Sequence, residues 1–210
     1  ALETHRHIPN EYARSSLFTV RRPRDARRSF TRQHLFHYND YIKVLFTGVE
    51  LRALDDEPVF MQLVHYGQSV ALGQPFKFTL SGFIEDLGWP RNGESYIRLK
   101  DCFSRLSAAE LYFENTKAYG KSPVFRLLKH YEATNDANGN VHSYQAVLDR
   151  SLIIFFAGNT FTSHHWQTYR KLSPVARRLA DYAGSHKAPY DLNIEMFRKL
   201  CDSGTKNKRS

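Results

Sequence analysis

The most regular pattern of polar and apolar positions lies between residues 169 and 201. Ser173 and Pro174 are residues favoured at the N-cap and first position of a helix. Apolar residues then recur at i, i+3, i+4 and i+7, which predicts a stripe turned toward the core. That stripe consists of Ala176, Leu179, Ala180 and Ala183. Arg177 and Arg178 fall outside it and are expected to be available to phosphates. A short strand and a second helix complete the segment.

A similar order of elements is expected earlier in the chain. A short strand over residues 76–80 precedes a helix that Ser81 caps and Gly88 ends. Asn92 or Gly93 then begins a longer helix with apolar residues near helical spacing. Three strands follow, at 111–119, 123–133 and 141–148, and a turn cluster at 135–140 joins the last two into a hairpin.

The remaining pattern predicts four further elements. Strands are expected at 34–38 and 41–46, the second with imperfect alternation of apolar and polar residues. Asp55 opens a helix whose acids suit the first turn. The apolar run 152–157 has the length of a buried strand.

Strand, helix, turn, longer helix and hairpin is the order of a winged helix, whose last helix lies in a DNA groove. The predicted fold class is therefore α+β, with two tandem winged-helix domains. We expect a basic N-terminal arm over 1–32, a first winged-helix domain over 33–158 and a second over 159–210. The second stops before the end of its reading helix and its wing.

Charge supports a polyanion as the partner. The chain has 210 residues and a formal net charge of +9. Residues 1–32 carry a net +5 and residues 160–210 a net +6, whereas the middle carries −2. Charge gathered at two ends of a neutral body indicates an electrostatic footprint.

Several classes of protein are disfavoured. No apolar run approaches the roughly 20 residues that cross a bilayer, and the first residues lack the apolar centre of a secretion signal. Cys102 and Cys201 are expected to be reduced core thiols of a cytoplasmic bacterial protein.

Candidate catalytic chemistry is weak. His34 and His37 are one residue too far apart to face the same side of a strand, and His5 and His7 flank a charged residue. No nucleotide-binding glycine loop is present, and the acids at 55–57 suit a helix start better than a two-metal site. We therefore expect no metal, no cofactor and no enzymatic activity.

A set of specific sequence motifs runs along most of the chain, from about residue 8 to 205. Its segments are Ala13–Thr19, Thr47–Ala53, Asp86–Trp89, Phe156–Gly158 and Tyr169–Arg178, with Asp181–Tyr182, Ser185–His186, Pro189–Tyr190, Phe197–Arg198 and Cys201. Together, and in this order, these motifs resemble the TrfA family of plasmid replication initiators.

The resemblance implies a DNA-binding function. Such initiators bind repeated sites, called iterons, in double-stranded plasmid origin DNA, assist origin opening, and recruit the host helicase and its loading proteins. It also implies binding as a monomer, with a less active homodimer formed through the first winged-helix domain. Two alternatives stay open, a metal-dependent rolling-circle nicking enzyme and a dimerising interaction module that no longer binds DNA.

The expected DNA contacts lie on the two reading helices and near them. In the second domain they are Lys171, Arg177, Arg178, Lys187, Lys206, Lys208 and Arg209, and in the first Arg91, Asn92, Ser95 and Arg98. Replacing Arg177 and Arg178 by alanine is expected to weaken DNA binding with little change in thermal stability.

Overall fold

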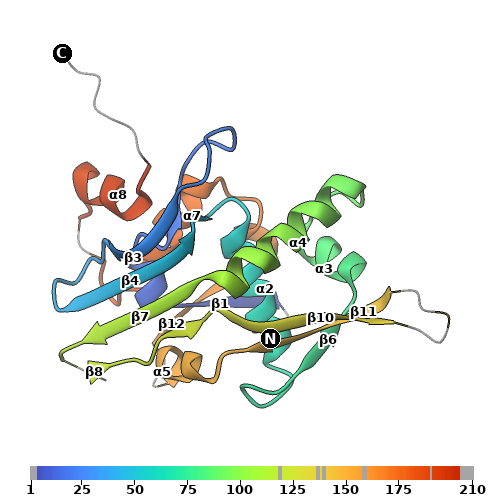
Figure 1. The fold of residues 1–210 in the computed structure, drawn as a ribbon. Coiled ribbons are helices and arrows are strands. Elements are labelled where there is room, and N and C mark those ends of the chain that lie inside the picture. The colour runs from blue at the N-terminus through green and yellow to red at the C-terminus, as the bar shows by residue number, and fades with distance from the viewer. Residues whose placement is uncertain are drawn as a thin grey trace.

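Figure 1 shows the computed structural model of the chain, which describes residues 4–117, 120–135, 138, 141–157, 160–189 and 191–203. Helices and strands are mixed along its whole length. No described helix is long and apolar enough to cross a membrane. Cys102 and Cys201 are both buried and free.

The N-terminal segment is part of the folded body. Strand β1 (His5–Pro9) leads into helix α1 (Asn10–Ala13) and strand β2 (Phe18–Thr19). β1 pairs with β12 (Phe161–His165), and β2 pairs with β5 (Leu51–Arg52). The expected extended arm over 1–32 is therefore wrong for residues 5–19, because their apolar side chains fill the core.

An antiparallel sheet forms one side of the molecule (Figure 1). Its strands are β3 (Ser29–Leu35), β4 (Ile42–Val49), β7 (Glu110–Asn115), β8 (Gly120–Lys121) and β9 (Phe125–Arg126). Ile42, Val44 and Phe46 of β4 are buried, as the alternation predicted.

The first winged-helix unit contains three helices and a second sheet. Its elements are α2 (Asp56–Gly67), β6 (Phe76–Phe78), α3 (Leu80–Leu87), α4 (Gly93–Ala108), β10 (Leu128–Asn135) and β11 (Val141–Leu148). Strands β10, β11 and β6 pair in that order, and β10 and β11 form the wing. Phe78, Phe83 and Phe103 pack their rings together between α3, α4 and this sheet.

The N-cap of helix α4 is the residue that the sequence suggested, and the N-cap of helix α3 is a different one. Asn92 caps α4, because its side-chain oxygen accepts from the Ser95 backbone N–H at 2.9 Å. Thr79, and not Ser81, caps α3 by accepting from Gly82 at 3.1 Å. The helix therefore begins at Leu80.

The predicted strand over 152–157 is wrong. The chain forms the 3₁₀ turn η2 (Arg150–Leu152) and helix α5 (Ile153–Phe156) there. Asp149 accepts from the Ser151 backbone N–H and starts the turn. Leu152 and Phe155 are buried at helical spacing.

The C-terminal part consists of helices α6 (Trp166–Tyr169), α7 (Pro174–Gly184) and α8 (Ile194–Cys201). Ser173 caps α7 as expected. The predicted strand between α7 and α8 is wrong for the described residues 185–189 and 191–193, which form no strand. The expected start of the second reading helix, residues 204–210, lies outside the described residues.

We expect Gly88→Ala to lower the free energy of unfolding by about 1–2 kcal/mol. Gly88 ends α3 with φ 71°, and an added Cβ would lie 3.1 Å from the Arg170 guanidinium, which donates to the Asp86 carbonyl at 2.9 Å. Urea unfolding measures the change. Gly93→Ala is the matched control, because nothing lies within 4 Å of its Cβ position and its change should stay within about 0.5 kcal/mol. Equal effects of the two substitutions would contradict the account.

Candidate nucleic-acid interface

Helix α7 turns the opposite face inward from the one its sequence suggested. Arg177, Arg178, Asp181 and Tyr182 are buried, whereas Leu179 of the expected apolar stripe is 50% exposed. Because the buried charges compensate one another, a polar face can line the interior here.

Arg178 is fully buried and joins three parts of the chain. Its guanidinium donates to Glu57 of α2 at 2.8 Å and to Asp181 of α7 at 2.9 Å. It also donates to the backbone carbonyls of Ala13 and Ser15, at 3.0 and 2.7 Å. The N-terminal segment, the first winged unit and α7 therefore share one cation.

The two acids around Arg178 have pKa values shifted in opposite directions. Burial, and then the charge of Asp181, raise the pKa of Glu57 well above its usual value. Burial also acts to raise the pKa of Asp181, but its contacts with His164, 2.8 Å away, and Arg178 outweigh burial and lower it. Beside Arg178, the ionised form is therefore favoured more strongly for Asp181 than for Glu57.

Arg177 is also structural. Its guanidinium donates to the carbonyls of Ala53 at 2.9 Å and Arg170 at 2.7 Å, and only 7% of the residue is exposed. The expectation that Arg177 and Arg178 contact phosphates is therefore wrong. Because both cations satisfy buried acceptors, we now expect their replacement to reduce stability.

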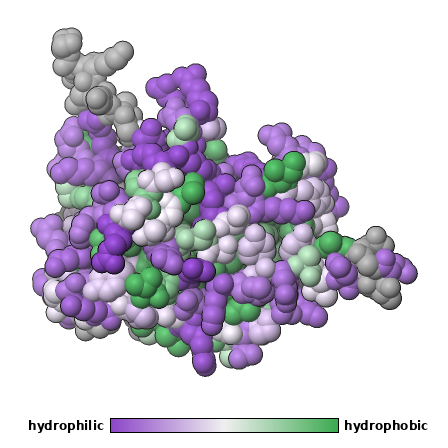
Figure 2. All heavy atoms as spheres, viewed as in Figure 1, coloured by the Kyte–Doolittle hydropathy of each residue, from purple (hydrophilic) through white to green (hydrophobic). Residues whose placement is uncertain are grey.

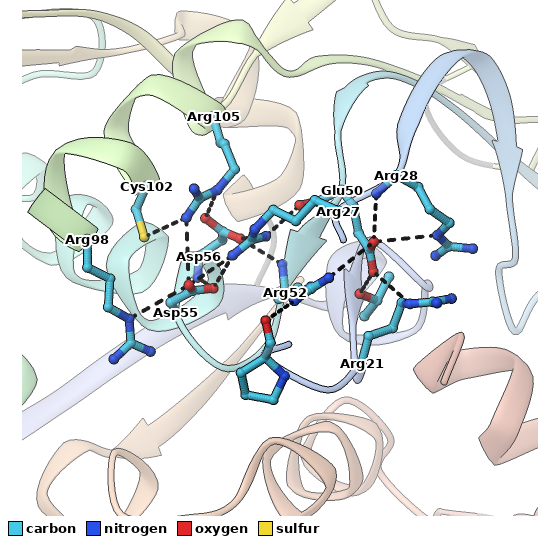
Figure 3. A network of polar contacts seen from close by, with 12 residues as sticks. Arg21, Arg27, Arg28, Glu50, Arg52, Asp55, Asp56, Arg98, Cys102 and Arg105 are labelled. Carbon is cyan, nitrogen blue, oxygen red and sulfur yellow. Dashed lines mark hydrogen bonds and ion pairs between the residues drawn. The ribbon is translucent and has the colours of Figure 1, made fainter. Parts of the chain in front are cut away.

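A second group of ion pairs surrounds the start of α2 (Figure 3). Arg27 donates to Asp55 at 2.9 Å and to Asp56 at 2.7 Å. Arg105 of α4 donates to Asp56 at 2.9 Å. The acids expected at a helix start do begin α2. Through Arg27 and Arg105 they also hold the loop before β3, and helix α4, against the start of α2.

Glu50 holds both ends of the same loop (Figure 3). Its buried carboxylate accepts from the Thr19 hydroxyl at 2.5 Å and from the Arg28 backbone N–H at 3.1 Å. Burial acts to raise its pKa, but these hydrogen bonds and the charges of Arg28 and Arg52 outweigh burial, so the pKa of Glu50 is lowered.

The atoms of Asp55, Asp56 and Cys102 lie close enough together to hold a metal ion. Arg27 and Arg105 already occupy the carboxylate oxygens, and burial raises the pKa of the Cys102 thiol well above its usual value. A neutral thiol beside two guanidinium cations is a poor metal ligand. We assign no metal to this cluster.

The candidate residues on the first reading helix are only partly free. The side chain of Asn92 caps α4, and Ser95 is buried. Arg91 is exposed but pairs with Glu85. Arg98 lies 4.1 Å from the centre of the Trp89 ring and 3.7 Å from Asp55, with about a third of its side chain exposed. Arg91 and Arg98 therefore both retain some exposed side-chain surface.

In the second unit Lys171 and Lys187 are exposed. Lys206, Lys208 and Arg209 lie outside the described residues. Two exposed arginines that the sequence analysis did not single out, Arg22 and Arg24, lie in the loop between β2 and β3. Their exposure, and the lack of a carboxylate partner among the described residues, distinguish them from Arg21, Arg27 and Arg28 of the same loop.

The histidine pairs do not converge on a metal site. His34 is exposed on β3, whereas His37 is buried with Nε2 3.0 Å from Glu11. His5 and His7 lie on β1, and the His7 ring is hydrogen-bonded to Ser163.

Comparisons with known proteins identify the family. The TrfA protein family model matches residues 1–210. The chain is also 39% identical over 201 residues to the plasmid replication initiator protein TrfA of Escherichia coli, across 96% of this chain and 52% of that protein. The chain belongs to the TrfA family. It spans about half the length of the curated relative that it matches.

Solved structures of RctB show the same fold at low identity. A crystal structure of RctB domains 2 and 3 matches with a TM-score of 0.64 at 12% identity, over 96% of this chain and 80% of that chain. A second structure of these domains, residues 155–483, matches with a TM-score of 0.57 at 12% identity, over 82% and 69%. The predicted α+β winged-helix class of this TrfA-family chain is confirmed.

We expect Arg178→Ala to destabilise the protein by about 3–5 kcal/mol, because it leaves two carboxyl groups and several carbonyls buried without their cation. Denaturant unfolding measures the loss. Lys171→Ala removes an exposed cation from the same region and should change stability by less than about 0.5 kcal/mol. A loss below about 1 kcal/mol for Arg178→Ala would show that the pair is not structural.

The lowered pKa of Glu50 predicts a specific acid sensitivity. A carboxyl group whose pKa is lower in the folded state stabilises the fold above its unfolded pKa, near 4.5, and this contribution is lost as pH falls. Glu50→Gln should therefore be less stable than the natural protein at pH 7, with the difference shrinking below about pH 4.5. Urea unfolding at a series of pH values tests this, and a difference independent of pH would count against it.

Proposed function

We propose that this chain binds repeated origin sites, or iterons, in double-stranded plasmid DNA as the DNA-reading part of a replication initiator. The single observation that carries the proposal is membership of the TrfA family across the whole chain. A curated relative at 39% identity is a plasmid replication initiator. The winged-helix arrangement of α3, α4 and the β10–β11 wing supplies a physical means for reading duplex DNA.

The proposed division places a first winged-helix domain over 33–158 and a second over 159–210. The match to domains 2 and 3 of RctB supports a two-domain organisation. Residues 5–19 pack against both domains through β12 and β5, so we assign them to the shared body. The buried pair between Glu57 and Arg178 joins the domains.

The DNA contacts proposed from the described residues are now Lys171, Lys187, Arg91 and Arg98. Lys206, Lys208 and Arg209 remain proposed contacts. Asn92 and Ser95 have structural roles at the start of α4, and they are proposed to place its first turn rather than to bind bases.

The wider role follows the family. We propose that the protein assists opening of the origin, recruits the host helicase and its loading proteins, pairs as a homodimer through the first winged-helix domain, and acts in the bacterial cytoplasm without catalysis. The arginine-occupied carboxylates at the start of α2 and the separated histidines support a non-catalytic role.

Binding of the full-length protein to a duplex that carries an iteron of its own plasmid should weaken steeply with salt. The log–log slope should be about −0.9 for each phosphate contacted. Fluorescence anisotropy across a salt series measures it, with a scrambled duplex as the control for sequence preference. A slope near zero, or equal affinity for both duplexes, would contradict the proposal.

Nicking of supercoiled plasmid with Mg²⁺ would favour the enzyme alternative, and a dimer without DNA affinity would favour the interaction module.

A further inference from the structure

The loop between β2 and β3 is held rigidly from its inner side. Arg27 pairs with Asp55 and Asp56, and Arg52 reaches under the loop to donate to the carbonyls of Arg22 at 3.1 Å and Asp25 at 2.8 Å. The Asp25 backbone N–H closes a turn on the Arg22 carbonyl at 3.0 Å. The backbone on which Arg22 and Arg24 stand is therefore fixed before any ligand binds.

The arginines of this loop fall into two groups. Arg21, Arg27 and Arg28 have carboxylate partners within 4 Å. Arg22 and Arg24 are exposed, and neither has an ion-pair partner among the described residues. Figure 2 shows the loop as a hydrophilic projection at the top of the molecule.

The loop lies between α4, which the proposed function places near DNA, and the end of α8. On one side, the Val20 backbone N–H donates to the Cys201 carbonyl at 2.7 Å, and Arg28 pairs with Asp202 at 2.5 Å, at the end of α8. On the other side, a cleft of about 510 Å³ separates Pro23 and Arg27 from Ile97 and Arg98 of α4. Figure 1 shows the loop beside the end of α8.

We infer that Arg22 and Arg24 form a phosphate-binding loop for duplex DNA, placed between α4, the proposed reading helix of the first domain, and the end of α8. Arginine presents a planar set of donors that matches phosphate oxygens. A loop already ordered by buried ion pairs loses little conformational entropy on binding. Residues 21–28 contain no aromatic side chain on which an unpaired base could stack, which favours duplex over single-stranded DNA.

This inference rests on the proposed function, and one experiment separates the two. The double variant Arg22→Ala with Arg24→Ala, in the full-length protein, is compared with the natural protein on iteron and scrambled duplexes over a salt series. We expect affinity for both duplexes to fall by roughly tenfold or more at about 0.1 M salt, with a log–log slope less steep by about 1.8. The ratio of the two affinities should stay the same, because phosphate contacts carry no sequence information.

Two controls make the result specific. Lys43→Ala with Lys121→Ala removes the same charge from exposed positions on β4 and β8 of the five-stranded sheet, and should leave the slope unchanged. Arg22→Lys with Arg24→Lys keeps the charge and should retain most of the slope. Circular dichroism melting confirms that each variant is folded.

The outcomes are distinct. If the natural protein binds the iteron with a steep slope and the Arg22–Arg24 variant behaves like the sheet control, the loop assignment is wrong and the proposed function stands. If the natural protein shows neither salt dependence nor preference for the iteron, both fail. An equal loss in the sheet control would show that only net charge matters, which also overturns the assignment.

Discussion

Three consecutive acids begin helix α2, and each meets a guanidinium from another part of the chain. Asp55 and Asp56 meet Arg27 and Arg105, and Glu57 meets Arg178. The positive end of the helix dipole favours acids at this position, but burial of charge is costly unless each group is paired and hydrogen-bonded. The loop before β3, helix α4 and helix α7 must therefore all be in place together.

This constraint sets the position of several of the described surfaces proposed to contact DNA. Arg105 fixes α4, Arg27 fixes the loop that carries Arg22 and Arg24, and Arg178 fixes α7 and the start of the second unit. A second link between the units lies at the end of α3, where Trp166 and Arg170 donate to the Asp86 carbonyl. Because these contacts are short and directional, the two units have a defined relative orientation.

Local elements were predictable wherever one segment determined its own structure. The cap at Ser173, the cap at Asn92 and the alternation along β4 each depend on neighbouring residues alone, and each is confirmed. The run 152–157 has the apolar length of a buried strand, but length alone cannot distinguish a strand from a buried helical turn. The structure resolves it as a turn and a short helix started by Asp149.

The sites that sequence could not predict depend on partners far away in the chain. Arg178 and Glu57 are 121 residues apart, so the sequence around either residue does not predict that they pair. The basic run at 21–28 suggests a solvated arm. In the structure, Arg21, Arg27 and Arg28 of this run pair with carboxylates of the folded body.

That division changes what the charge of +9 means. The charge of an arginine paired with a buried carboxylate is cancelled by that carboxylate. Such an arginine does not neutralise a DNA phosphate, so it releases no counterions when DNA binds. The electrostatic footprint is then smaller than the composition suggests and is confined to cations that remain exposed. With few such contacts, affinity depends on how accurately they are placed. The buried ion pairs at the start of α2 fix the positions of the elements that carry the exposed cations. The buried arginines therefore determine where the exposed arginines and lysines can contact DNA.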